Sequence, residues 1–279
     1  METLQAPAIH GKHGQTHGRI ARLLDEKQGF GQLVVSPDDL AAEARISRLA
    51  TERQLQRLGS RVALLPGQPR SYLIVPPEHR RGGAPPLTAW LHDYCQIRDI
   101  PYYVGLLSSA ALHGSSAQAA QISQVMTTRP QRRIGIGRLT IDFHVKRALK
   151  ETPLTAFPGL AAPLAVSSPE ATALDLIEFN HAIGGMRRAV EVIEGMTPRM
   201  TLAGWRRALH EAVPVSVRQR LGYVLTLLNL ESYAAMVEKS LRSRLNPTVL
   251  QTRSPASKSR LKPIIPFHIL ENIDLRSDR

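Results

Sequence analysis

Apolar residues in the first sixty positions recur at helical spacing in three successive segments. A serine, Ser36 or Ser47, precedes the second and the third segment, where its side chain can cap a helix by accepting a backbone N–H. Pro37 and the two acids after it suit the first turn of the second helix. Three helices are therefore expected, over about residues 20–27, 37–44 and 48–58.

Two short apolar runs follow the third helix, at residues 61–65 and 71–75, with a Pro/Gly-rich turn between them. Two apolar strands around such a turn predict a β-hairpin. Three helices followed by a hairpin are typical of a winged helix-turn-helix. We therefore expect a flexible head over residues 1–16, a winged helix-turn-helix over 17–79 and a linker over 80–86.

Residues 87–279 are expected to form a second domain that begins with alternating helices and strands. A helix over about 87–98 should be followed by a helix of small residues over about 104–113, which ends at Gly114. Alternating apolar positions predict strands at 134–136 and 139–145, with a turn or a bulge between them.

From Ser168 onward the apolar spacing is helical, and this half of the second domain ends in a basic tail with a short apolar element at residues 263–270. The predicted fold class is therefore α+β. An N-terminal winged helix-turn-helix is followed by a mixed α/β domain whose C-terminal half is largely helical.

Composition indicates a globular protein with a polyanionic partner. Apolar residues make up 43% of the chain, and the formal net charge is +13. Residues 129–150 hold seven basic residues against one acid, and residues 239–262 hold seven with none. No run approaches the roughly 20 apolar residues of a membrane helix. One cysteine and a first segment without an apolar core favour the cytoplasm, with no membrane partner.

The second helix of a helix-turn-helix enters the major groove of DNA, and here it would be residues 48–58. Arginine can pair with guanine, glutamine with adenine, and threonine can meet a phosphate or a thymine methyl group. Leu49 fits the buried face of this helix poorly. The alternative is that the unit serves protein contact. The residues expected to contact DNA are Arg48, Thr51, Arg53, Gln54 and Arg57, with Arg70 at the tip of the hairpin.

The chain shows no convergent catalytic set, so we expect no enzyme activity and no cofactor or metal. Three histidines, at positions 10, 13 and 17, lie in the flexible head. His113 is interpreted as a helix-end residue, and Ser167 with Glu170 fits a capping box. Asp142, Glu170 and Asp175 would suit a nuclease, but the Glu-x-Lys expected on a following strand is missing.

Two segments in the middle of the chain resemble the AbiEi-type antitoxins of abortive-infection (type IV) toxin–antitoxin systems. The first is Tyr102-Tyr103-Val104-Gly105 with a small-residue helix that closes in His113-Gly114, followed by Gln124–Thr127. The second is Ser168-Pro169-Glu170, which leads to Leu174-Asp175-Leu176. Together with the winged-helix pattern, the resemblance covers roughly residues 17–230.

The resemblance implies an autorepressor that binds an inverted repeat in double-stranded DNA upstream of its own operon. It also implies that the second domain counteracts a cognate nucleotidyltransferase-type toxin. A ligand-responsive winged-helix regulator without a toxin is the alternative, and a metal-dependent nuclease is a third hypothesis. Basic residues expected on a surface for DNA or for an acidic toxin face are Arg129, Arg132, Arg133, Arg138, Lys146 and Arg147.

Overall fold

The computed structural model describes residues 18–115, 122–157, 163–210, 212–241, 244–252 and 261–275. Within these residues the protein has a mixed α+β fold with ten α-helices and three β-sheets. The chain divides into two compact units, of which the first comprises residues 18–98 together with Ile136–Leu139. The remaining described residues form the second unit. The domain boundaries and the linker at 80–86 remain a prediction, and most of the head lies outside the described residues.

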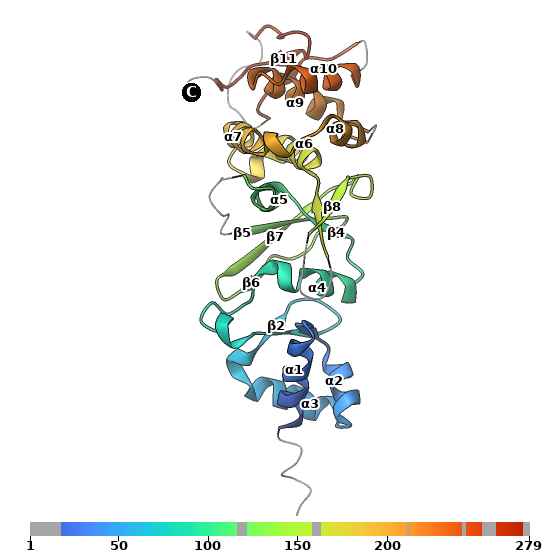
Figure 1. Ribbon diagram of the computed structural model, residues 1–279, viewed down its shortest axis with the longest axis vertical. Coiled ribbons are helices and arrows are strands. Elements are labelled where there is room, and N and C mark those ends of the chain that lie inside the picture. The colour runs from blue at the N-terminus through green and yellow to red at the C-terminus, as the bar shows by residue number, and fades with distance from the viewer. Residues whose placement is uncertain are drawn as a thin grey trace, which may run out of the picture. The chain divides into compact units, whose positions relative to one another are not determined.

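Three helices and a three-stranded sheet make up most of the first unit (Figure 1). The sheet is antiparallel, with the strand order β1-β3-β2. The helices and the two hairpin strands lie where the apolar pattern predicted them, whereas β1 was not predicted. The helices are α1 (Arg19–Gly29), α2 (Pro37–Ala44) and α3 (Arg48–Arg57), and the strands are β1 (Val34–Val35), β2 (Val62–Leu65) and β3 (Ser71–Ile74).

Serine caps fix where the second and third helices begin. The Ser36 hydroxyl oxygen accepts a hydrogen bond from the Asp38 backbone N–H at 3.1 Å, and Ser47 accepts one from Ala50 at 3.2 Å. Between the two helices, Arg45 adopts a left-handed conformation with φ of 51°, which makes the turn short. The helices and the sheet bury a common set of apolar side chains: Ile20, Leu24, Leu40, Leu55, Leu65 and Leu73.

The helix expected over residues 87–98 is interrupted at Trp90. A 3₁₀ turn at Leu87–Ala89 precedes α4 (Leu91–Ile97), because Trp90 has φ of −148° and leaves the helical region. Helix α4 packs against the turn between β2 and β3. The Tyr94 hydroxyl donates to the Pro66 carbonyl at 3.1 Å, and the Arg98 guanidinium donates to Ser71 Oγ at 2.8 Å.

A six-stranded mixed sheet, in the order β6-β7-β5-β4-β9-β8, belongs mainly to the second unit. Strand pairs β5–β7 and β4–β9 are parallel, whereas β4–β5 and β8–β9 are antiparallel. The strands at 134–136 and 139–145 were predicted, whereas β8 and β9 were not. The strands are β4 (Tyr102–Val104), β5 (Ile122–Thr127), β6 (Ile134–Ile136), β7 (Leu139–Val145), β8 (Leu154–Phe157) and β9 (Leu164–Ser167).

Helices pack against this sheet and against one another in the second unit (Figure 1). The small-residue helix begins at Leu106, two residues later than predicted, because Val104 ends strand β4. Helix α6 is central: it contacts α5, α7, α8 and α9, and it buries every residue from Glu170 to Ile177. The helices are α5 (Leu106–Leu112), α6 (Pro169–Glu178), α7 (Met186–Met196), α8 (Leu202–Ala208), α9 (Val215–Leu227) and α10 (Glu231–Lys239).

The apolar element near the C-terminus completes the core of the second unit. Strand β10 (Thr248–Val249) pairs in parallel with β11 (Ile269–Leu270), and Phe267 is buried. A Cβ on Gly222 of α9 would lie 2.1 Å from the Phe267 ring, so the glycine allows this ring to pack on the helix. The basic residues between positions 253 and 260 lie outside the described residues. Among those described, no helix is long and apolar enough to cross a membrane.

Candidate functional site

The exposed face of α3 carries most of the side chains predicted to contact DNA. Arg48, Arg53 and Arg57 are exposed, and Gln54 is half-buried. Thr51 is the exception, since its side chain is completely buried and its hydroxyl donates to the Ser47 carbonyl at 3.2 Å. A buried hydroxyl cannot reach a base edge, and we therefore leave Thr51 out of the proposed contact set.

Leu49 settles the orientation of α3. In the sequence this leucine fitted the buried face of the helix poorly. Its side chain is in fact 58% exposed, whereas Leu55 and Thr51 point into the core. The buried stripe of α3 is therefore narrow, and Arg53 and Arg57 lie on the opposite side of the helix, whereas Arg48 lies next to the stripe and pairs with Asp38 of α2. This arrangement leaves a polar face with one apolar side chain on it.

An acidic residue, Glu52, lies between two of the arginines predicted to contact DNA. Its carboxylate oxygen is 3.4 Å from Arg48 Nε and 3.8 Å from an Arg70 guanidinium nitrogen. Arg70 is half-buried and its guanidinium carbon lies 5.8 Å from the centre of the Tyr72 ring. Arg48 also pairs with Asp38 at 3.1 Å. Glu52 therefore links α3 to the β2–β3 hairpin and offsets part of the positive charge there.

The six basic residues predicted for a second surface do not share one environment. Arg129, Arg132 and Arg147 are exposed residues of the second unit, whereas Arg138 belongs to the first unit. Arg133 is exposed and forms a bidentate pair with Asp142, with one contact at 2.7 Å. Hydrogen bonding from Arg133 lowers the pKa of the Asp142 carboxyl group.

Lys146 does not lie on the surface, contrary to the prediction. It is 8% exposed, and its ammonium group donates to Oδ1 of the completely buried Asp175. The Tyr103 hydroxyl donates to Oδ2 of the same carboxylate at 2.8 Å. Burial and the Asp175 charge raise the pKa of the Tyr103 phenol. A buried Lys-Asp-Tyr cluster thus joins β7, α6 and β4.

A second buried polar cluster joins the two segments that carry the family motifs. The hydroxyls of Ser109, Ser167 and Thr172 lie within 3.0 Å of one another, and His113 Nε2 lies 2.7 Å from the Ser167 carbonyl oxygen. Burial lowers the pKa of His113. His113 follows the last residue of α5, in agreement with its interpretation as a helix-end residue.

The cap of α6 differs from the predicted capping box by one residue. Ser168, rather than Ser167, caps the helix by accepting a hydrogen bond from the Ala171 backbone N–H at 3.2 Å. Glu170 does not reach back to its own helix. Its carboxylate accepts hydrogen bonds from the Thr201 backbone N–H at 2.7 Å and the Thr201 hydroxyl at 3.3 Å, where it supports the start of α8.

The three carboxylates that invited a nuclease hypothesis have separate partners. Asp142 pairs with Arg133, Glu170 binds Thr201, and Asp175 pairs with a buried lysine. Over the residues that the structure describes, no three His, Cys, Asp or Glu side chains are grouped so that they could hold a metal ion. The thiol of Cys95 is buried, and its burial raises its pKa. The three carboxylates therefore do not share one site.

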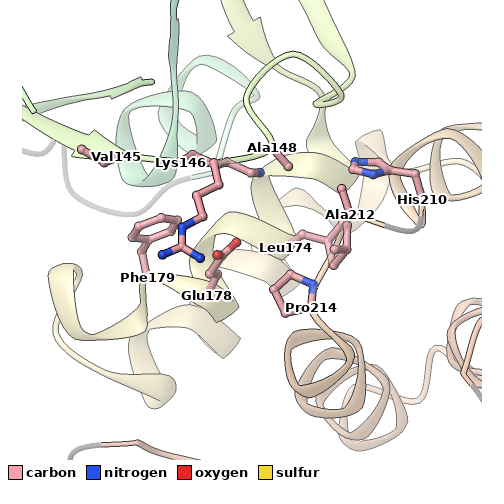
Figure 2. Close-up of a pocket in the computed structure, with 11 residues that line it drawn as sticks. Val145, Lys146, Ala148, Leu174, Glu178, Phe179, His210, Ala212 and Pro214 are labelled. Carbon is pink, nitrogen blue, oxygen red and sulfur yellow. The ribbon is translucent and has the colours of Figure 1, made fainter. Parts of the chain in front are cut away.

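The second unit contains a cavity of about 430 Å³ beside Lys146 (Figure 2). It lies where β7, the C-terminal end of α6 and the residues before α9 meet. Burial raises the pKa of Glu178 and lowers the pKa of His210, and both side chains line this cavity. The lining residues are Val145, Lys146, Arg147, Ala148, Leu174, Glu178, Phe179, His210, Ala212, Val213 and Pro214.

Comparisons with known proteins agree with the motifs. Residues 103–227 match the family model of the AbiEi antitoxin C-terminal domain. The fold is similar to the crystal structure of the RV2827C protein from Mycobacterium tuberculosis, with a TM-score of 0.63 and 17% identity over 92% of each chain. No curated protein matches the chain. The chain therefore contains a domain similar to the AbiEi antitoxin C-terminal domain, at residues 103–227, and this match supports an AbiEi-type antitoxin.

Proposed function

We propose that the protein is a DNA-binding antitoxin that represses its own operon and counteracts a cognate nucleotidyltransferase-type toxin. The observation that carries this proposal is the match of residues 103–227 to the AbiEi antitoxin domain. In this proposal the protein catalyses no reaction, needs no cofactor or metal, and acts in the cytoplasm. Its partners are an inverted repeat in double-stranded DNA and the toxin.

The first unit is the proposed DNA reader. Its element order, α1-β1-α2-α3-β2-β3, supports a winged helix-turn-helix, in which α3 would be the recognition helix and the β2–β3 hairpin the wing. Arg48, Arg53 and Arg57 project from α3, and Arg70 lies at the base of the wing turn. The net charge of +13 supports a polyanionic partner.

The proposed toxin-facing side belongs to the second unit. Exposed Arg129, Arg132 and Arg147 would meet an acidic face of the toxin, or add phosphate contacts on DNA. The buried Lys146-Asp175-Tyr103 cluster serves this role only indirectly, because it holds together the strands and the helix that present the exposed residues.

The DNA part is tested with the full chain and a fluorescent duplex from upstream of its own gene. The proposal expects tighter binding to this duplex than to a scrambled one. The double variant Arg53→Ala/Arg57→Ala should lose at least about tenfold in affinity, because two contacts to the duplex disappear. Arg206→Ala, an exposed arginine on α8, is the matched control and should bind like the wild type. Equal binding by the double variant would remove α3 as the reader.

A ligand-responsive regulator without a toxin is the second candidate, and the cavity beside Lys146 favours it. The two functions differ in a simple way. An antitoxin should restore the growth of cells that express a toxin encoded by an adjacent nucleotidyltransferase-type gene. A regulator of the second kind would bind its operator differently when its ligand is present and would not protect those cells.

A further inference from the structure

The cavity beside Lys146 has the size and the lining of a small-molecule site. Its volume of about 430 Å³ falls within the range of roughly 300–1,000 Å³ that is usual for ligand pockets. Leu174 and Val213 are buried apolar residues of the wall, and Phe179 adds an aromatic ring. Figure 2 shows Lys146, Glu178, His210 and Pro214 around the same space. Few polar groups among apolar walls are typical of a site that orients one small ligand.

Two basic side chains, Lys146 and Arg147, and one carboxyl group, that of Glu178, belong to the described lining of the cavity. The positive charge of Lys146 is offset by Asp175, which lies behind it and is completely buried. Arg147 lines the cavity and contributes a second positive charge. Burial raises the pKa of Glu178, so this carboxyl group holds its proton more tightly than an exposed glutamate does. Burial and the nearby charge of Lys146 lower the pKa of His210, which favours the neutral form of its imidazole.

The start of α9 adds to the positive potential of this wall. Pro214 lines the cavity and immediately precedes the helix, whose first turn contains no acid and has no side-chain cap. The N-terminal end of a helix carries a partial positive charge, although the Val217 N–H in the first turn of α9 already donates to the Pro214 carbonyl at 3.0 Å. Together with Arg147, this end of α9 favours one negative group in the cavity.

We propose that this cavity binds a small organic monocarboxylate, whose carboxylate contacts Arg147 and Lys146 and whose apolar body packs on Phe179 and Val213. Arginine binds a carboxylate through two parallel hydrogen bonds, which fixes the orientation of the ligand. A phosphate monoester brings a second negative charge close to Asp175 and Glu178, where no further cation of the lining balances it. A monocarboxylate is therefore the better match.

The test uses isothermal titration calorimetry on the full-length protein with three monocarboxylates: benzoate, phenylacetate and indole-3-acetate. Phenylacetamide is the neutral analogue and phenyl phosphate the dianionic one. We expect at least one acid to bind with a dissociation constant below about 10 mM, the range of a ligand with roughly ten non-hydrogen atoms. The amide and the phosphate should bind at least about tenfold more weakly.

Two variants place the binding in the cavity. Arg147→Gln should weaken binding of the acid at least about tenfold, while Arg206→Gln, an exposed arginine on α8 that does not line the cavity, should not change it. Ala212→Trp, at an exposed position of the lining, should block the cavity while the circular-dichroism spectrum stays that of the wild type.

Three results would overturn the proposal: no acid binds, the amide or the phosphate binds as well as the acid, or Arg147→Gln and Ala212→Trp bind like the wild type. The outcome is independent of the antitoxin role, because neither DNA nor a toxin takes part in the titration. A protein that binds the acid and fails to protect cells would retain this site and lose the proposed function.

Discussion

Tyr103 of β4 donates its phenolic hydrogen bond to Oδ2 of Asp175 in α6 at 2.8 Å, although 72 positions separate the two residues. Lys146, at the end of β7, donates to the other oxygen of the same carboxylate. One carboxylate thus connects two strands of the sheet to the central helix. Because the three side chains are nearly or completely inaccessible to water, the Asp175 carboxylate depends on Lys146 and Tyr103 for its polar contacts.

Loss of the Asp175 charge should destabilise the protein strongly. Asp175→Asn leaves Lys146 buried without its counter-charge, and we expect a loss of about 3–5 kcal/mol in the free energy of unfolding. Urea denaturation followed by circular dichroism measures this loss. Asp142→Asn is the matched control, because its pair with Arg133 is largely exposed and its loss should be much smaller.

A double variant separates the lost charge from lost packing. Asp175→Leu/Lys146→Met removes both charges together and should recover a large part of the stability that Asp175→Asn loses. If Asp175→Asn were as stable as the wild type, the buried Lys146-Asp175 pair would not stabilise the second unit.

Removal of the acid on α3 should tighten DNA binding. Glu52 lies next to Arg48 and Arg70, so Glu52→Gln removes the acid beside Arg70 and one of the two acids paired with Arg48, and it takes away a charge that repels phosphates. We expect affinity for the upstream duplex to rise about threefold to tenfold at low salt, and the gain to shrink as salt increases. Fluorescence anisotropy at two salt concentrations measures both effects. Weaker binding by Glu52→Gln would show that the acid positions the arginines rather than opposing the DNA.

Thr51 offers a contrast on the same helix. Its buried hydroxyl bonds only to the Ser47 carbonyl among the contacts described, so Thr51→Val should leave DNA affinity within about twofold of the wild type. The variant should lose about 1 kcal/mol of stability, because it gives up one internal hydrogen bond. The same anisotropy assay compares it with Arg53→Ala, which should bind more weakly. A Thr51→Val protein that is stable but loses affinity as Arg53→Ala does would place the hydroxyl at the DNA after all.

The pKa of Glu178 predicts how stability depends on pH. Burial raises the pKa of this carboxyl in the folded protein above the value of about 4.3 in the unfolded chain, so the folded state holds the proton more tightly. Stability from this group is present at low pH and decreases as pH rises from about 4 through the raised pKa. Glu178→Gln cannot ionise, and its stability relative to the wild type should therefore be greater at pH 7 than at pH 4. Equal differences at the two pH values would contradict the raised pKa.

Local pattern was sufficient for the three helices and the hairpin of the first unit, because each of them carries its own signal, whereas β1 and the break at Trp90 were not predicted. The serine caps and the Pro/Gly turn mark boundaries within a few residues, and the predicted second helix coincides with α2. Strands β8 and β9 were missed, since four residues next to prolines show no clear alternation. Their pairing depends on β4, a partner that is distant in the sequence.

Side-chain environments were harder to predict than elements. Lys146 was taken for one more member of a basic run, because its partner Asp175 is 29 positions away. A signal was nevertheless present: an aspartate inside the apolar run Ala173–Ile177 needs a buried partner. Thr51 was predicted to face DNA but is buried. Helix α3 has few apolar residues, so their spacing does not fix which side of the helix faces the core. The cavity had no sequence signal, since its lining comes from separate segments of the second unit.

Growth rescue is the most direct test of the central claim that this chain is an antitoxin. The whole chain is co-expressed with the product of an adjacent nucleotidyltransferase-type gene, the toxin proposed for it, and colony-forming units are counted after induction of that gene. The account predicts restored growth with the wild type, and equally with Arg53→Ala/Arg57→Ala, since neutralisation is assigned to the second unit. Continued growth arrest in cells that contain soluble, folded wild-type protein would contradict it.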